Sequence, residues 1–272
     1  MNLSLLRERA ALLLRLHDRT RILLLPNCWD VASARVIESL GFPALATGSA
    51  GVAAVLGYAD GERIPRGEML EMVARIVRAV KVPVTADLEA GYGDPGGTVE
   101  AALEAGAVGM NFEDGLAKSA DLAETPEQAK RIAAARAAGD RHGVHFVINA
   151  RTDVFLRGIG EERDRLAHAL DRARAYLAAG ADCIFVPGVK DEATIGKLAS
   201  GIEGPLNILG TTGSPSVSKL AALGVARVSA GAGPMRAALT AGKRAAEEMR
   251  DRGTFGFAEG ILSAPEVNKL FS

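Results

Sequence analysis

Two carboxylates stand two positions apart in the stretch TADLEAGYGDP, residues 85–95, directly after an apolar run. Asp87 and Glu89 are followed by a tyrosine between two glycines, which indicates a tight turn at the end of a strand. Acids that crowd a partly buried cleft repel one another, and a hard divalent cation with oxygen ligands relieves that repulsion. The stretch therefore predicts either a metal site or a solvated acidic turn, and its spacing alone leaves both open.

Polar residues also follow most of the other apolar runs of the chain. They are Asn27 to Asp30, Thr47 to Gly51, Asn111, Glu113 and Asp114, Asn149, Arg151 and Asp153, Thr211 and Thr212, and Ser229. If the runs are parallel strands of a barrel, their carboxyl ends meet at one mouth, where chemistry is concentrated. Several acids and Arg151 would then converge there. They could bind a metal ion, or pair with Arg151 and nearby lysines as a structural network.

The elements that must position these residues alternate regularly along the chain. Short aliphatic or β-branched runs cover residues 21–27, 43–48, 82–88, 107–113, 145–151, 182–188, 205–211 and 226–231. Helical periods cover residues 30–40, 66–80, 97–105, 125–142, 161–179, 191–199, 216–223 and 235–250. Eight strands alternating with eight helices predict an α/β fold of the (β/α)8 TIM-barrel type, with residues 1–272 as one domain. An open doubly wound sheet is disfavoured because PNCWDVAS, and not G-x-G-x-x-G, follows the first run.

Composition excludes several classes of partner. With 272 residues and 48% hydrophobic content, the chain can bury one large core. A net charge of −1 and 4% aromatic residues argue against a nucleic-acid surface. Arg and Glu interrupt the apolar clusters of residues 1–26, which argues against a membrane span or a signal segment. Cys28 and Cys183 match no zinc or redox spacing, so we expect a cytoplasmic protein.

A C-terminal helical extension is predicted over residues 251–272. Its apolar residues, which a closed barrel does not need, are Phe255, Phe257, Ile261, Leu262 and Leu270. Such a segment is a poor match for solvent. It therefore packs either on a neighbouring subunit, which we favour, or on its own barrel.

Four segments between residues 25 and 236 together resemble the isocitrate lyase and phosphoenolpyruvate mutase superfamily. TGSAGVAAVLGYAD is similar to its substrate-binding turn and gating loop, and DLEAGYGD to its D-x-[DE]-x-G-[YF]-G metal motif. GMNFED resembles the strand with the metal-linked glutamate, and INARTDVF the segment whose arginine holds the substrate carboxylate. Each motif alone is weak, but four in register on successive strands are specific.

The resemblance implies a set of ligands and roles. It implies Mg²⁺, with Mn²⁺ as a substitute, bound directly by Asp87 and through water by Glu89 and Glu113. It implies Glu113 and Arg151 as catalytic residues. Substrate-binding residues would be Thr47, Gly48, Ser49, Ala50, Asp60, Arg151, Thr211 and Arg236, with Asp60 also reaching the metal waters. It also implies a homo-oligomer, a dimer or tetramer, in which a C-terminal helix is swapped between subunits.

The chain departs from the lyases of this superfamily at two places. Where they carry a K-[KR]-C-G-H lid loop, this chain reads EDGLAKSADLAETPEQ, without cysteine or histidine. Gly188, in FVPGVK, stands where the lyases place a glutamate. The general acid or base is therefore unassigned, and the candidates on loops are Tyr58, Lys118 and Ser119.

We therefore expect a Mg²⁺-dependent lyase or hydrolase that cleaves a C–C or P–C bond of a small 2-oxo acid through a metal-stabilised enolate. The substrate would be oxaloacetate-like or phosphonopyruvate-like. Alternatives are a catalytically degenerate barrel that binds a 2-oxo dicarboxylate, and a methylisocitrate-lyase-like enzyme with an atypical lid. A Schiff-base aldolase fits less well, because no predicted strand ends in lysine.

Overall fold

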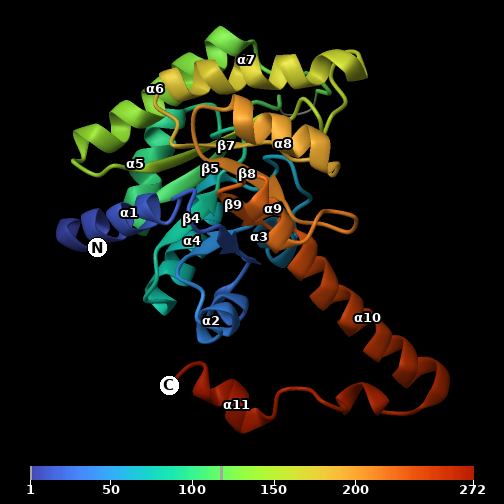
Figure 1. The fold of residues 1–272 in the computed structure, drawn as a ribbon. Coiled ribbons are helices and arrows are strands. Elements are labelled where there is room, and N and C mark those ends of the chain that lie inside the picture. The colour runs from blue at the N-terminus through green and yellow to red at the C-terminus, as the bar shows by residue number, and fades with distance from the viewer. Residues whose placement is uncertain (1, 117–118) are drawn as a thin grey trace.

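The sheet of this protein closes on itself around a central core (Figure 1). A computed structural model describes residues 2–116 and 119–272. All strands are parallel, and their order is β1-β9-β8-β7-β6-β5-β4-β3-β2. β1 and β2 belong to one segment, interrupted at Pro26, which has no N–H to give to a ladder. The sheet is therefore an eight-stranded barrel whose first strand is divided, and the predicted α/β barrel is confirmed.

The strands lie within the apolar runs that the sequence marks. They are β1 Leu23–Leu25, β2 Asn27–Cys28, β3 Leu45–Thr47, β4 Val84–Asp87, β5 Gly109–Glu113, β6 Val147–Arg151, β7 Cys183–Phe185, β8 Leu206–Leu209 and β9 Arg227–Ser229. Most of their residues are buried on both faces, as expected of a parallel sheet covered by helices.

Helices surround the barrel, and most match the predicted helical periods. They are α1 Leu3–Arg15, α2 Val31–Ser39, α3 Ser49–Val55, α4 Arg66–Ala79, α5 Pro95–Ala105, α6 Thr125–Arg141, α7 Arg165–Ala178, α8 Glu192–Gly201, α9 Val217–Ala222, α10 Gly233–Arg252 and α11 Ala264–Lys269. Short 3₁₀ turns lie at Glu162–Asp164 and Gly256–Ala258. The helix α3 adds to the predicted set, since that segment was expected as a turn and a loop. In the described part of the chain, no helix is long and apolar enough to cross a membrane.

The loop between β4 and α5 is short because the start of α5 is strongly marked. Asp94 accepts a hydrogen bond from the Gly97 N–H at 3.0 Å, and Pro95 occupies the first turn. Both features favour a helix start at this point. Gly106 ends the helix in the left-handed conformation, with φ 91°. The acidic turn after Asp87 is thus held between a strand end and a capped helix.

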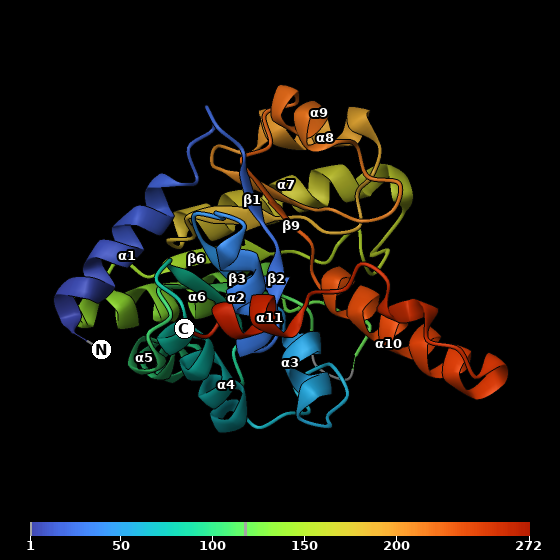
Figure 2. The same cartoon turned by 90° about the horizontal axis from the view of Figure 1, so that it is seen from below.

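The C-terminal segment extends away from the barrel. α10 projects outward, and the chain then returns so that α11 lies near α2 (Figures 1 and 2). Phe255 and Ile261 are 64% and 62% exposed, and in α10 only Met235 is buried. A groove lies between α2 and α11. It is lined by Val36 and Leu40 on one side and by Leu262 and Leu270 on the other. Swapping of this segment between subunits therefore stays a prediction.

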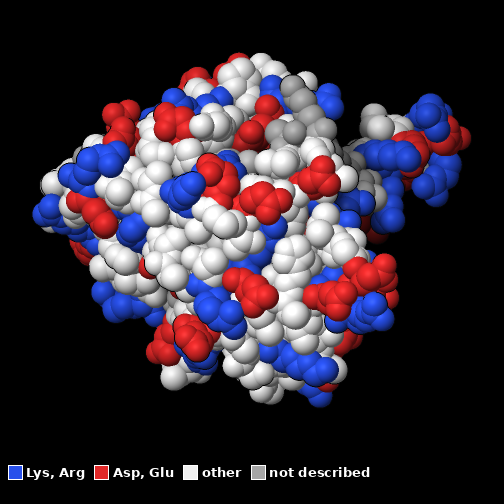
Figure 3. Space-filling model, turned by 90° about the horizontal axis from the view of Figure 1, so that it is seen from above, with Lys and Arg blue, Asp and Glu red and all other residues white. Residues whose placement is uncertain are grey.

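Charged side chains of both signs are interspersed on the molecular surface (Figure 3). On the face shown, lysine and arginine alternate with aspartate and glutamate and do not gather by sign. This distribution agrees with the near-neutral net charge of −1.

Candidate active site

A small cavity of about 170 Å³ opens beside the carboxyl ends of the strands. Its lining combines acidic and basic side chains from the ends of β5 and β6 and from the loops that follow α3, β4 and β6. The lining residues are Ser49, Asp60, Gly61, Glu62, Glu89, Ala90, Glu113, Gly115, Arg151 and Arg157. Residues far apart in the sequence thus meet at the mouth, as the barrel prediction required.

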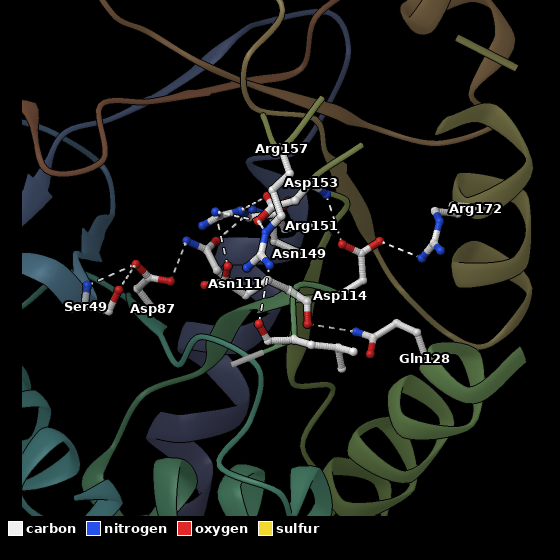
Figure 4. Close-up of polar contacts among 12 residues, drawn as sticks. Ser49, Asp87, Asn111, Asp114, Gln128, Asn149, Arg151, Asp153, Arg157 and Arg172 are labelled. Carbon is white, nitrogen blue, oxygen red and sulfur yellow. Dashed lines mark hydrogen bonds and ion pairs between the residues drawn. The ribbon is translucent and has the colours of Figure 1, made fainter. Parts of the chain in front are cut away.

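The Asp87 carboxylate is held in a fixed orientation at the end of β4 (Figure 4). Its Oδ2 accepts hydrogen bonds from the N–H and the hydroxyl of Ser49, at 3.0 and 2.8 Å. Asn111 Nδ2 lies 3.4 Å from Oδ1, and the Asp87 N–H donates to Thr47 Oγ1 at 2.9 Å. Residues of β3, α3 and β5 therefore position this carboxylate before any ligand binds.

Glu89 lies in a strained turn that the neighbouring loop fastens. Glu62, Glu89 and Tyr92 have φ of 53°, 50° and 54°, values that non-glycine residues rarely adopt. The Glu62 N–H donates to Glu89 Oε2 at 2.5 Å, and Glu62 Oε1 accepts from the Tyr92 N–H at 2.9 Å. This reciprocal pair docks the loop that carries Asp60 onto the acidic turn.

The environment of Glu89 favours its protonated form. Burial raises the pKa of Glu89 to about 8, the Asp87 charge adds to this shift, and the hydrogen bond from Glu62 opposes it. Glu89 Oε1 is buried, and among the described residues it has no hydrogen-bond partner. An unpartnered buried carboxylate oxygen is costly unless a water or a cation meets it.

Glu113 and Arg151 face each other across β5 and β6, where they are register partners. Glu113 Oε2 lies 3.1 Å from Arg151 Nη2, and Arg151 Nε and Nη2 donate to the Asp153 carboxylate at 2.6 and 3.1 Å. Burial raises the pKa of Glu113 to about 8, and Arg151 limits the shift. Burial alone would lower the pKa of Arg151, but the charges of Glu113 and Asp153 raise it above its ordinary value. Arg151 is thus fixed as a guanidinium at the cavity wall.

This donor set suits a hard divalent cation. Carboxylate oxygens are what Mg²⁺ prefers, and the unpartnered Glu89 Oε1 is an oxygen left for a water or an ion. Within the described ranges, no three His, Cys, Asp or Glu side chains lie close enough to ligate one ion directly. This arrangement agrees with one direct ligand, Asp87, and with Glu89 and Glu113 acting through water. The ligand assignment itself stays a prediction.

Not all of the predicted substrate-binding residues line the cavity. Ser49, Asp60 and Arg151 line the cavity, whereas Thr211 and Arg236 are exposed and lie outside its lining. The Thr47 hydroxyl serves Asp87, and the Gly48 N–H donates to the Cys28 carbonyl at 3.0 Å. Because Ser49 also gives its N–H to Asp87, Ala50 has the one N–H of the Gly48–Ser49–Ala50 turn for which the described residues offer no acceptor.

The loop candidates for the acid or base find partners outside the cavity. Tyr58 donates its hydroxyl to Glu68 at 2.9 Å, and Ser119 donates to Asp121 at 2.8 Å. Lys118 lies outside the described residues. Neither cysteine supplies the missing thiol, because both are buried and burial raises the pKa of Cys28 to about 12.

Gly188 marks a side of the mouth that is closed by backbone. Its φ is 92°, and a Cβ at this position would lie 2.8 Å from the backbone N and Cα of Leu156. A glutamate of the lyase type cannot occupy the position without a shift of the chain.

Sequence reasoning missed Asn111 as an Asp87 partner, Glu62 as a loop fastener and Arg157 in the cavity lining. Asn111 could have been found, because it alternates with Glu113 on β5 and therefore points to the same face. Glu62 and Arg157 lie on loops, whose sequences carry no such periodicity.

Comparisons with known proteins show the family of this chain and its fold. The family model described as phosphoenolpyruvate phosphomutase matches residues 13–250. The oxaloacetate decarboxylase of Chromohalobacter salexigens is 34% identical over 259 residues, which are 90% of this chain and 85% of that protein.

Solved structures give the same picture. A candidate lyase/mutase of Burkholderia cenocepacia has a TM-score of 0.91 and 38% identity, with 98% of this chain and 97% of that one covered. Phosphonopyruvate hydrolase in complex with oxalate and Mg²⁺ has a TM-score of 0.84 and 26% identity, with 96% and 94% covered. Oxaloacetate acetylhydrolase in complex with 3,3-difluorooxaloacetate has a TM-score of 0.85 and 26% identity, with 96% and 92% covered.

Proposed function

Because the chain belongs to the phosphoenolpyruvate phosphomutase family, we propose that it is a Mg²⁺-dependent enzyme that cleaves a C–C bond of a small 2-oxo acid. The leading substrate is oxaloacetate. The observation that carries this proposal is the Asp87 carboxylate, which Ser49 and Asn111 hold next to a small cavity. Ser49 itself, Glu89, Glu113 and Arg151 line that cavity.

Each residue of the cavity has a distinct part in this reaction. Asp87 would hold the ion directly, with Glu89 and Glu113 hydrogen-bonded to its waters. When bound there, Mg²⁺ would supply a Lewis acid for the 2-oxo acid end of the substrate and stabilise enolate charge. Arg151 would orient the distal acidic group, since its charge is fixed by Glu113 and Asp153. The Ala50 N–H is the backbone donor left for a substrate oxygen.

The missing lid cysteine favours oxaloacetate over isocitrate-type substrates. Cleavage of a 2-hydroxy acid of that type needs a base that removes a hydroxyl proton and an acid that returns one. Loss of CO₂ from oxaloacetate needs an electron sink next to the breaking bond and only a later proton. The acidic residues would hold the ion that serves as the sink, and Arg151 would bind the anion, whereas Tyr58 and Ser119 are turned to other partners.

The exposed C-terminal segment supports a homo-oligomer as part of this proposal. Phe255, Ile261 and Leu262 are more than half exposed, which is unfavourable unless another subunit covers them. Light scattering on the full chain and on a chain that ends at residue 250 would show whether the segment holds subunits together. A monomeric full chain would contradict this part.

The test of the proposed function is a substrate panel with Mg²⁺ or with EDTA. The panel contains oxaloacetate, phosphonopyruvate, phosphoenolpyruvate, methylisocitrate and 2-oxoglutarate, with enzyme-free Mg²⁺ blanks because oxaloacetate decays spontaneously. We expect turnover of oxaloacetate that EDTA abolishes. Turnover that persists in EDTA would contradict the metal role. Tight 2-oxo acid binding without any turnover would identify a degenerate barrel, and preferred turnover of phosphonopyruvate would reassign the bond that breaks.

A further inference from the structure

Arg157 is the second guanidinium of the cavity wall, and nothing in the proposed reaction assigns it a role. It lies in the turn after β6, six residues beyond Arg151. Its Nε donates to Asp153 Oδ2 at 3.1 Å. Its Nη1 donates to the backbone carbonyls of Leu116, Ser119 and Asp121, at 3.3, 2.7 and 3.2 Å. Arg157 therefore fastens the backbone that stands where the lyases carry their lid (Figure 4).

The remaining nitrogen, Nη2, has no acceptor among the described residues. It lies against Gly115, where a Cβ would collide with the guanidinium. Gly115 and Arg157 both line the cavity, and the Arg157 side chain is 25% exposed. The absence of a side chain at residue 115 thus leaves room for the guanidinium at the cavity wall.

The two arginines differ in how their charges are compensated. Arg151 has Glu113 as a partner and shares Asp153, whose side chain is 1% exposed. Among the described residues, Arg157 has Asp153, which it shares with Arg151, as its one acidic partner, and its other partners are neutral carbonyls. A guanidinium with a free N–H and a partly compensated charge is a strong site for a carboxylate.

We propose that Arg157 is a specificity-determining residue, which donates Nη2–H to the distal carboxylate of a 2-oxo dicarboxylate while Arg151 contacts the same group. This inference rests on the proposed function and names its substrate class. The acidic side of the cavity, with Glu89 and Asp60, would take the chelating 2-oxo acid end. The basic side would take the second carboxylate, so an acid without that group lacks a partner for Arg157.

Two ligands that share one end separate this role from a structural one. Oxalate offers only a chelating end, whereas 3,3-difluorooxaloacetate adds a distal carboxylate. Calorimetric titration with Mg²⁺ would use the wild-type chain, Arg157→Gln and Arg157→Lys. The matched control is Arg165→Gln, since Arg165 also donates to backbone carbonyls, those of Gly158 and Gly160, but does not line the cavity.

We expect Arg157→Gln to weaken the binding of 3,3-difluorooxaloacetate about 10- to 100-fold, the usual loss for a hydrogen bond to a charged group. The binding of oxalate should weaken less than about threefold. Arg157→Lys should retain part of the affinity because the charge remains. With oxaloacetate as substrate, KM should rise more than kcat falls. Arg165→Gln should leave both affinities unchanged.

The opposing results are distinct. Equal weakening of the binding of oxalate and 3,3-difluorooxaloacetate would show that Arg157 acts only by holding the backbone at Leu116, Ser119 and Asp121. If Arg157→Gln lowered turnover of phosphonopyruvate alone, the distal group that Arg157 contacts would be a phosphonate and not a carboxylate. If the wild-type chain binds oxalate with Mg²⁺ but Arg157→Gln and Arg157→Lys keep full affinity for 3,3-difluorooxaloacetate, the inference alone is wrong. If wild type shows no Mg²⁺-dependent oxalate binding, the proposed function fails and the inference fails with it.

Discussion

Glu113 and Asp114 are neighbours in the sequence, yet they belong to two different kinds of carboxylate cluster. Asp114 is fully buried, and both oxygens of its carboxylate accept hydrogen bonds from the protein. Oδ1 accepts from the Asp153 N–H at 3.0 Å, and Oδ2 accepts from Arg172 Nη1 at 2.9 Å and from the Tyr176 hydroxyl at 2.8 Å. Glu113 points into the cavity, with Arg151 as its charged partner.

The difference separates polar groups that hold the fold from polar groups that await a ligand. Around Asp114, a satisfied buried network joins β5, β6 and α7 (Figure 4). At the cavity, burial raises the pKa of Glu113. The nearby Glu89 Oε1 has no hydrogen-bond partner within the described ranges. Unfinished hydrogen bonding at a buried acidic site is a sign of function, whereas complete hydrogen bonding is a sign of structure.

The largest effect should come from Asp87→Asn, which removes a charge from the unfinished cluster. The amide can still accept from Ser49, so the fold should be kept, with a change of less than about 1 kcal/mol in the free energy of unfolding. Loss of the metal's charge stabilisation should lower Mg²⁺-dependent kcat/KM about 10³-fold or more. Asp94→Asn, at the exposed start of α5, is the control in steady-state assays. Unfolding of Asp87→Asn would place Asp87 in a structural network instead.

The adjacent pair tests the comparison directly. Asp114→Asn leaves the Arg172 guanidinium buried without a counter-charge, and should cost about 3 to 5 kcal/mol in the free energy of unfolding. Glu113→Gln, one residue away, should cost less stability and lower Mg²⁺-dependent activity. Denaturant unfolding and Mg²⁺ titrations on both variants check this contrast. Equal stability losses would erase the distinction between the clusters.

A smaller effect is expected at Gly188, where the backbone of Leu156 leaves no room for a side chain. Gly188→Ala brings a Cβ within 2.8 Å of Leu156 backbone atoms at φ 92°, and should cost about 2 kcal/mol or more. Gly41→Ala is the matched control, because its φ is 83° but a Cβ there would meet nothing within 4 Å. In thermal unfolding, the melting temperature of Gly188→Ala should lie well below that of Gly41→Ala. Similar values for both would mean that only backbone strain matters.

The smallest effect on stability is expected at the buried side chain of His17, and it should appear only at acidic pH. His17 Nδ1 donates to the Leu13 carbonyl at 2.8 Å, while Nε2 faces Arg227 Nη1 at 3.4 Å. Burial, helped by the Arg227 charge, lowers the pKa of His17 to about 4. The unfolded chain binds this proton first, so stability should fall as pH drops from about 6.5 to about 4, by about 2 kcal/mol at pH 5. Denaturant unfolding of wild type against His17→Gln isolates this contribution, and identical pH profiles would exclude it.

Much of the barrel could be predicted because its cause is local. Apolar runs alternate with helical periods, and parallel strand ends share one mouth, so the ends of β4, β5 and β6, which carry Asp87, Glu113 and Arg151, lie side by side. The roles of these residues stay a prediction. The split of the first strand at Pro26 and the helix α3 were not predicted. For Thr211 and Arg236 the sequence suggested substrate contacts, but the structure leaves both side chains exposed beyond the cavity lining. Reaching a strand end is a matter of periodicity, whereas entering a cavity depends on the loops around it.

The amino-acid sequence by itself determined the barrel, the acidic turn after Asp87 and the absence of a lid cysteine, because each of these is written in neighbouring residues. Only the tertiary structure showed what each of two adjacent acids contacts, Asp114 the buried Arg172 and Glu113 the cavity residue Arg151. It also brought Arg157 to the carbonyls of Leu116, Ser119 and Asp121, about forty positions earlier in the chain. Closure of the barrel sets such distant contacts, and no local pattern encodes them.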